Sequence, residues 1–280
     1  MAVVRTLAEA MPSTQEPVPE DRPLLTFTDV SLSFGALQAL KSVSFEVQPH
    51  ELFSIIGPHG AGKTSIFNCI SGVYHPDEGG ITFLGENLRR KSPHGIAELG
   101  IARTFQNIEL FENLTVLENV MLGRHQHVEY GWLAGMIWAG RASREEIEHR
   151  AVVEDILDFL EIEQHRDAIV SMLPYGVQKR VELGRALAME PKLLLLDEPV
   201  AGMNLEETAD MARFVLDIRE ELDISVILVE HDMGVVMDLA DRVLCIDFGE
   251  VIACDVPSVV QDDPEVIRAY LGESEEVAAE

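Results

Sequence analysis

The chain has 280 residues, of which 49 are acidic and 21 basic, so its formal net charge at pH 7 is -28. With 47% hydrophobic and 25% charged residues, the composition is that of a globular protein and argues against global disorder. The length fits one large domain or two closely joined ones. The negative charge argues against nucleic acid as the main ligand, because binding to a duplex requires a basic surface.

The N-terminal part is predicted to be an arm followed by short strands. Residues 1–23 contain scattered prolines and charges without periodicity, which predicts a flexible arm with no secretory signal. Three β-rich segments follow at 24–34, 43–47 and 52–56, with a turn at Gly35.

The segment after the third predicted strand has the pattern of a glycine-rich loop and a helix. Ile66, Phe67, Ile70 and Val73 recur at helical spacing, and Gly72 stands where a helix would stop. We therefore expect a strand, a loop and a helix in this order.

The middle of the chain, from about residue 107 to 189, favours helix formers. We expect the segment 141–162 to form an amphipathic helix. Its predicted apolar face consists of Ile147, Val152, Ile156, Leu157 and Leu160. An apolar stretch at 130–140 holds Trp132 and Trp138, and is far shorter than the ~20 residues that cross a bilayer. It packs within the helical region, faces a membrane partner or lies near the lipid surface.

Strands are expected to return in the last third of the chain. KLLLLDEP and ISVILVEH contain uninterrupted apolar runs, as strands of a buried parallel sheet do. VLCIDFGEVIAC predicts a hairpin that turns at Phe248-Gly249. A helix over 264–273 and a loose acidic tail over 273–280 end the chain. Cys69, Cys245 and Cys254 lack CxxC spacing, which favours reduced thiols of a cytosolic protein over disulfides or a zinc site.

The first chemical motif is GPHGAGKT at residues 57–64, which fits G-x-x-x-x-G-K-[ST]. Its glycines let successive backbone N–H groups converge on a phosphate in front of a helix N-terminus. Lys63 would reach the β- and γ-phosphates, and the Thr64 hydroxyl would bind Mg²⁺. The position between an apolar strand and a helix makes an ordinary glycine turn a poor alternative, and the motif predicts a nucleotide site.

The second motif is Asp197-Glu198 at the end of the apolar run LLLL. In open α/β sheets, ligands bind at the C-terminal ends of the strands. Asp197 would hold Mg²⁺, directly or through water, and Glu198 is placed to polarise an attacking water molecule. Taken alone, an apolar strand that ends in two acids is common; after a phosphate loop it favours a hydrolytic site.

These residues resemble the ATPase subunit of an ATP-binding cassette (ABC) transporter over roughly residues 24–272. ARTFQN carries the Q-loop glutamine, Gln106; LPYGVQKRVELGRAL corresponds to the signature segment; and ILVEHDM carries the switch histidine, His231. Phe34 stands where the family stacks an aromatic ring on adenine. Each of these residues alone has an ordinary structural explanation, and their order along the chain is what carries the resemblance.

The resemblance implies the cofactors ATP and Mg²⁺ and the following site. Catalytic roles fall to Glu198, His231 and Gln106. Metal ligation falls to Thr64, Gln106 and Asp197. Nucleotide binding falls to Phe34, Gly57, Pro58, His59, Gly60, Ala61, Gly62, Lys63, Thr64, Ser65, Tyr175 and Gly176.

The implied fold class is α/β: a P-loop NTPase (RecA-like) core with an antiparallel β subdomain and an inserted α-helical subdomain over about 107–189. The ABC ATPase domain would span residues 24–272. Implied partners are a second ABC ATPase subunit, identical or paralogous, the membrane permease subunits and, indirectly, an extracytoplasmic solute-binding protein. The chain would lie at the cytoplasmic face of the cell membrane.

Within the family, the chain most resembles the ATPases of branched-chain and other hydrophobic amino acid importers. The tyrosine in the signature, the long insert and the closing VIRAYLGE support this interpretation. Urea or amide uptake and lipopolysaccharide export remain alternatives. A cassette that acts on nucleic acid or ribosomes is disfavoured by the charge. A regulator without turnover is disfavoured by Glu198 and His231.

The sequence departs from the commoner family pattern at four positions. Pro174 replaces the signature serine and has neither a hydroxyl nor an N–H to donate. We therefore expect contacts to the γ-phosphate to come from the backbone around Gly176, with Pro174 in the first turn of a helix. Val177 replaces a polar residue, Asn204 stands at a usual aspartate and His59 at a usual asparagine. These changes bear on affinity and turnover rate.

Overall fold

The computed structural model describes residues 7, 11, 21–106, 108–127 and 141–277. It divides into two compact units. The core unit comprises residues 21–103, Leu193–Glu198 and 224–277. The helical unit comprises Thr104–Lys192 and Pro199–Asp223 together with Leu7 and Met11. Trp132 and Trp138 lie outside the described residues.

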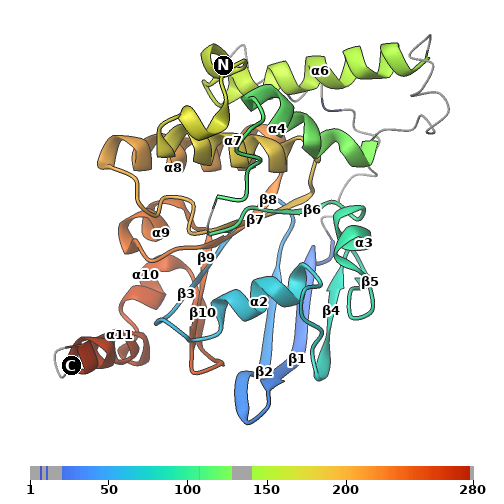
Figure 1. The fold of residues 1–280 in the computed structure, drawn as a ribbon. Coiled ribbons are helices and arrows are strands. Elements are labelled where there is room, and N and C mark those ends of the chain that lie inside the picture. The colour runs from blue at the N-terminus through green and yellow to red at the C-terminus, as the bar shows by residue number, and fades with distance from the viewer. Residues whose placement is uncertain (1–6, 8–10, 12–20, 107, 128–140, 278–280) are drawn as a thin grey trace. The chain divides into compact units, whose positions relative to one another are not determined.

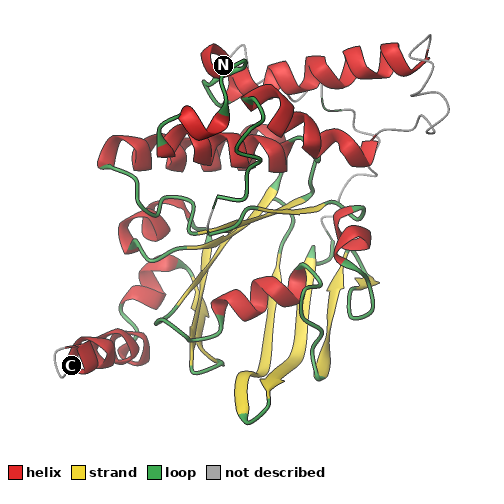
Figure 2. Ribbon diagram, viewed as in Figure 1, coloured by secondary structure: helices red, strands yellow, loops and turns green. Residues whose placement is uncertain are grey.

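The core unit contains two sheets (Figures 1 and 2). An antiparallel sheet has the order β2-β1-β4-β5, and a six-stranded sheet has the order β10-β9-β3-β8-β7-β6. In the second sheet all neighbouring pairs are parallel except β9 with β10. The strands are β1 (Leu25–Phe34), β2 (Leu37–Val47), β3 (Leu52–Ile56), β4 (Glu78–Phe83), β5 (Glu86–Asn87), β6 (Ile101–Arg103), β7 (Leu193–Asp197), β8 (Ser225–Val229), β9 (Arg242–Asp247) and β10 (Glu250–Asp255).

The central strands of the parallel sheet form because their sequences are apolar on both faces. Every residue of β3, β7 and β8 is buried, as expected for strands covered on two sides. Since β3, β8 and β7 are successive neighbours, their C-terminal ends lie at one edge of the sheet. The core-unit helices are α2 (Lys63–Ile70), α3 (Pro93–Ala97), α9 (Met233–Leu239), α10 (Pro257–Gln261) and α11 (Pro264–Val277).

The hairpin of β9 and β10 turns at Phe248 and Gly249, as the sequence predicts. Their φ angles of 43° and 79° are both positive, which is the combination that type I′ hairpin turns require. Gly249 also approaches β2 closely, because a Cβ there would lie 2.7 Å from the Ala39 carbonyl oxygen.

The helical unit contains helices and loops and, among its described residues, no strand (Figure 2). Its α-helices are α4 (Val116–Gly123), α6 (Arg141–Phe159), α7 (Tyr175–Leu187) and α8 (Leu205–Leu222), with short 3₁₀ turns η1 (Arg124–His127), η2 (Glu163–His165) and η3 (Val170–Met172). Helices α4, α6 and α7 pack on one another, and the Phe159 and Phe214 rings, 6.2 Å apart, join α6 to α8. In the described residues, no helix is both long and apolar enough to cross a membrane.

Two predicted features of the helices are wrong. Gly72 adopts a φ of 73° after α2 has ended, so Val73 is not on the helix and is 54% exposed. On α6, Ile147 is 67% exposed whereas Val152, Ile156 and Leu157 are buried, as is Leu160 just after the helix. At about 100° per residue, Ile147 lies on the opposite side of the helix from Ile156.

The two ends of the chain differ from their predictions where they are described. Leu7, in the segment expected to be a flexible arm, is fully buried, and its carbonyl accepts a hydrogen bond from the Met11 N–H. Helix α11 continues to Val277, inside the segment expected to be a loose tail. Of the thiols, Cys69 and Cys245 are buried, and burial raises the pKa of each to about 12. Cys254 is half-buried.

Candidate functional site

The phosphate loop, residues 57–62, connects buried β3 to α2 in the core unit. Gly57 has a φ of 144°, and a Cβ at this residue would lie 2.0 Å from the Ile246 carbonyl oxygen. Gly62 caps α2 in a left-handed conformation with a φ of 115°. Glycine is therefore required at both ends of the loop, and α2 begins directly behind it at Lys63.

The Lys63 side chain folds back over the loop in front of its own helix. It is buried, and its Nζ donates hydrogen bonds to the carbonyl oxygens of Gly57 and Pro58, the second at 2.8 Å. Thr64 is exposed and Ser65 half-buried on the first turn of α2. Together the ammonium group, the hydroxyls and the helix N-terminus form an electropositive edge that suits a phosphate.

Of the two predicted carboxylates, Asp197 ends β7 and Glu198 follows it, at the neighbouring part of the same sheet edge. Asp197 is 4% exposed. Glu198 is in the left-handed region, with a φ of 50°, and its N–H donates to the Val229 carbonyl of β8 at 2.8 Å. A non-glycine residue in this conformation is uncommon, and such strain gathers at functional sites.

The structure places the side chains of His231 and Glu198 next to each other. The distance between His231 Nε2 and Glu198 Oε1 is 2.5 Å. The His231 N–H donates to the Glu230 carboxylate at 3.0 Å, which fixes the backbone just after β8. Glu198 therefore has an imidazole beside it that can orient the carboxylate and exchange a proton with it.

Asp197 has a partner that sequence reasoning missed, Arg103 at the end of β6. The distance from Arg103 Nη2 to Asp197 Oδ2 is 2.9 Å, and both side chains are buried. Arg103 Nη1 also donates to Asn68 Oδ1 at 2.7 Å and to Ser71 Oγ at 3.2 Å, at the far end of α2. The sequence contained one indication of this pair: ARTFQN includes an arginine, and a buried acid such as Asp197 requires a partner.

Phe34 ends β1 with 45% of its surface exposed, so one face of its ring can meet a flat ligand. Its ring forms an edge-to-face pair with Tyr74, whose ring centroid lies 5.0 Å away at an interplanar angle of 70°. Tyr74 was also missed, because nothing in the sequence links residue 74 to residue 34.

The remaining predicted residues belong to the helical unit. Gln106 is exposed, and its carbonyl accepts a hydrogen bond from Lys179 Nζ at 3.0 Å. Lys179 forms a buried ion pair with Glu182, 3.6 Å away, and Glu182 accepts the Phe105 N–H at 3.2 Å. Burial raises the pKa of the Glu182 carboxyl, and Lys179 opposes this shift. Helix α7 therefore holds the Q-loop backbone at residues 105 and 106.

The signature segment places Tyr175 and Gly176 in the first turn of α7. Pro174 precedes the helix as its N-cap, so its predicted place within the first turn is wrong by one residue. Gly176 is buried against α8, because a Cβ there would lie 2.5 Å from Glu207 Oε1. Tyr175 is 44% exposed.

The donor set fits Mg²⁺ held together with a nucleotide. Magnesium prefers oxygen ligands, keeps several waters, and is usually bound through one or two carboxylates plus substrate phosphates. Asp197 and Thr64 supply a carboxylate and a hydroxyl. Among the described residues, no group of three or more acidic, histidine or cysteine side chains forms an all-protein metal cage, and a magnesium–nucleotide site does not require one.

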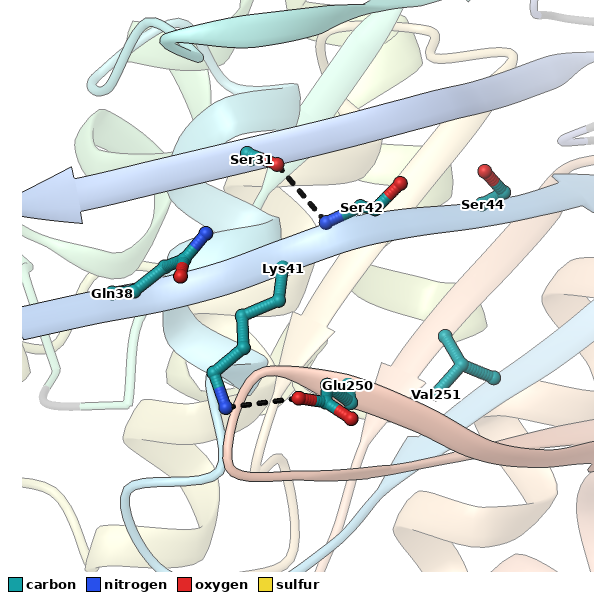
Figure 3. Close-up of a pocket in the computed structure, with 7 residues that line it drawn as sticks. All are labelled: Ser31, Gln38, Lys41, Ser42, Ser44, Glu250 and Val251. Carbon is teal, nitrogen blue, oxygen red and sulfur yellow. Dashed lines mark hydrogen bonds and ion pairs between the residues drawn. The ribbon is translucent and has the colours of Figure 1, made fainter.

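A hollow of about 430 Å³ on β1, β2 and β10 contains none of the predicted site residues (Figure 3). Lys41 and Glu250 form an ion pair of 3.0 Å in it, and Ser31 Oγ accepts the Ser42 N–H (Figure 3). These polar groups bind one another, and the hollow is not the candidate site.

Comparison with known families identifies the chain. A family model described as ABC transporter matches residues 40–201, which is more than half of the chain. The chain belongs to the ABC transporter ATP-binding family. It is therefore an ATPase cassette, as the motifs predict. A second model, described as branched-chain amino acid ATP-binding cassette transporter, matches residues 250–276 of this cassette.

The cassette has curated relatives over nearly its whole length. It is 37% identical over 253 residues to the high-affinity branched-chain amino acid transport ATP-binding protein BraF of Pseudomonas aeruginosa, covering 90% of this chain and 99% of that protein. It is also 37% identical to the corresponding protein LivG of Escherichia coli K12, with the same coverage. A probable LivG of Archaeoglobus fulgidus is 33% identical over 249 residues.

Solved structures confirm the predicted fold class. A nucleotide-free cassette from an ABC transporter superposes with a TM-score of 0.78 at 30% identity, covering 89% of this chain and 99% of that one. The ADP conformation of the cassette MJ1267 gives the same TM-score at 30% identity, covering 90% and 99%. The roles of individual residues stay predictions.

Proposed function

We propose that this cassette hydrolyses ATP to power an importer of branched-chain or other hydrophobic amino acids. The names of its relatives and the match at residues 250–276 support this assignment. The partners would be a second cassette, identical or paralogous, the membrane permeases and, indirectly, an extracytoplasmic solute-binding protein. The cassette would then work at the cytoplasmic face of the membrane.

The observation that carries the hydrolytic step is the 2.5 Å contact of Glu198 with His231. The Glu198 carboxylate accepts a proton from the attacking water, which raises the nucleophilicity of that water. His231 holds the carboxylate in place. Because Glu198 follows β7 and His231 follows β8, the two groups are delivered to the edge where β3 enters the phosphate loop.

The phosphate loop supplies binding and charge stabilisation. The N–H groups of residues 60–65 and the start of α2 surround the phosphate oxygens, and Lys63 exchanges its carbonyl partners for the β- and γ-phosphates. Mg²⁺, when bound, neutralises charge on the β- and γ-phosphates, and Thr64, Asp197 and Gln106 would hold it. Phe34 offers its exposed ring face to adenine.

The signature would act on ATP bound by the second cassette. Pro174 offers no donor, so the contact to the γ-phosphate falls to the first N–H groups of α7, at Tyr175 and Gly176. The dipole of this helix favours an anion at the same end.

Glu198→Gln tests the hydrolytic assignment. The amide keeps the shape of the side chain and removes its basicity, so we expect kcat to fall at least about 100-fold while ATP binding is retained. The variant should also form a dimer that depends on ATP. Glu250→Gln, an identical chemical change at an exposed ion pair, serves as the control. Hydrolysis by Glu198→Gln at the wild-type rate would refute the role of Glu198.

The transport assignment needs a separate test. The cassette is co-expressed with its candidate permeases and receptor and reconstituted in vesicles, and ATP-dependent uptake of labelled leucine is compared with uptake of labelled urea. We expect leucine uptake that disappears with Glu198→Gln. Uptake of urea and not leucine would refute the proposed solute class and leave the hydrolytic assignment intact.

A further inference from the structure

His59, in the phosphate loop, packs its ring on the ring of His231. The two centroids are 4.7 Å apart and the planes are inclined by 6°, so the imidazoles are stacked in parallel. His59 is exposed on the loop that follows β3, and His231 follows β8 in the same unit. The stack thus joins the phosphate loop directly to the residue that contacts Glu198.

The contacts of His231 show what the stack adds. Its ring edge meets Glu198 Oε1 at 2.5 Å, and its backbone N–H is bound by Glu230. A hydrogen bond at one ring atom fixes the direction of that atom and leaves the ring free to tilt about it. A parallel neighbouring ring restricts this tilt, because the stacked area is lost when the planes diverge.

We propose that His59 is a positioning residue that holds the His231 imidazole in the plane from which Nε2 reaches Glu198. This inference rests on the proposed function, since it takes Glu198 and His231 as the hydrolytic pair. An asparagine at position 59 has no ring to stack. The phosphate loop of this chain therefore contributes to the orientation of the hydrolytic pair as well as to phosphate binding.

The two contributions of residue 59 can be separated by substitution. Its N–H and carbonyl groups remain in the loop whatever the side chain, so a change of side chain alters the stack and leaves the backbone cradle in place. Phenylalanine keeps a flat ring that can stack, whereas alanine removes it. Because His59 is exposed, neither change opens a cavity in the core.

The test is a double-mutant cycle in the purified full-length chain. His59→Ala, His59→Phe, His231→Ala and the His59→Ala/His231→Ala double variant are compared by kcat and KM for ATP hydrolysis, and thermal unfolding checks that each is folded. We expect His59→Ala to lower kcat about two- to tenfold, with KM changed by less than about twofold. His59→Phe recovers most of this loss. In the His231→Ala background, His59→Ala has no further effect.

Each other outcome has a definite meaning. A rise in KM at unchanged kcat would place the ring of His59 on the nucleotide and overturn the inference. So would an equal loss of kcat in the His231→Ala background, because the ring would then act without His231. If His231→Ala alone hydrolyses ATP at the wild-type rate, the proposed role of His231 is refuted. The inference about His59 is then refuted with it, because it requires His231 to act in hydrolysis.

Discussion

Arg103 ties Asp197 to the helix that follows the phosphate loop. Its guanidinium binds the Asp197 carboxylate at 2.9 Å and the Asn68 side chain of α2 at 2.7 Å. The two charged residues end the adjacent parallel strands β6 and β7, and both side chains are nearly excluded from solvent, at 9% and 6% exposure. The carboxylate proposed to hold Mg²⁺ is therefore held by Arg103, whose guanidinium is bound in turn by α2.

Arg103→Met is expected to destabilise the chain strongly. The substitution keeps side-chain volume and leaves the Asp197 charge buried without its ion pair, which costs about 3–5 kcal/mol. Urea unfolding of the nucleotide-free chain measures the loss. The control is Lys41→Met, which breaks the exposed Lys41–Glu250 pair and should cost less than about 1 kcal/mol. Equal losses in the two variants would contradict the structural role of Arg103.

Two glycines of the phosphate loop should respond differently to alanine. At Gly57 the new Cβ would lie 2.0 Å from the Ile246 carbonyl oxygen, so β9 or the loop must move, whereas at Gly60 the Cβ meets no atom within 4 Å. Since both residues have positive φ angles, each variant carries backbone strain of about 1–2 kcal/mol. We expect Gly57→Ala to lose at least about 2 kcal/mol more than Gly60→Ala. Thermal unfolding without nucleotide compares them, and equal midpoints would contradict the close contact.

Asn204 should matter as a helix cap, whatever its role in turnover. Its Oδ1 accepts hydrogen bonds from the N–H groups of Glu206 and Glu207 at 2.9 and 3.1 Å, and the Asn204 N–H donates to the Glu207 carboxylate at 3.0 Å. Asn204→Ala is expected to cost about 1 kcal/mol, and Asn204→Asp almost nothing, because both residues cap well. Urea midpoints of the two variants provide the comparison. A loss for aspartate as large as for alanine would show that the cap is not what stabilises this turn.

His149 should make stability depend on pH. Burial first, and then the Arg124 charge, lower the pKa of His149 on α6, and Arg124 Nε lies 3.3 Å from its Nδ1. The unfolded chain therefore binds this proton more readily than the folded chain. The contribution of His149 to folding stability is present above the unfolded pKa of about 6.5. It is lost as the pH falls from there toward the folded pKa.

Urea unfolding at pH 7.5 and 5.5 tests this sign. His149→Gln should lose less stability between the two pH values than the wild type does. His75→Gln, at an exposed histidine, should keep the wild-type difference. If His149→Gln shows the full wild-type loss, another group is responsible for the acid sensitivity.

The sequence predicted the fold wherever local pattern and burial agree. The apolar runs at β3, β7 and β8 are buried on both faces, and Phe248-Gly249 requires the turn that it forms. The prediction failed where a boundary or a helix face depends on one residue. The helix does stop before Gly72 as predicted, but Val73 was counted in the helical pattern although it lies beyond that stop. Ile147 was assigned to the buried side of α6 although its angular position is opposite.

The candidate site was predictable as a set of motifs and not as a set of contacts. The sequence places Glu198 and His231 after separate strands, and only the order of β7 and β8 in the sheet brings them within 2.5 Å. Arg103, Tyr74 and the stack of His59 on His231 depend on strands or loops that are distant in the chain. No spacing rule connects such residues.

The phosphate loop is also hydrogen-bonded to the β9–β10 hairpin, near the other end of the chain. The Ala61 carbonyl accepts the Gly249 N–H at 2.9 Å, and the Gly249 carbonyl accepts the Lys41 N–H at 2.8 Å. During synthesis the N-terminal residues leave the ribosome first, so the loop emerges long before the hairpin that supports it. Contacts between such distant residues also form slowly. The phosphate loop should therefore gain this support only when translation is nearly complete.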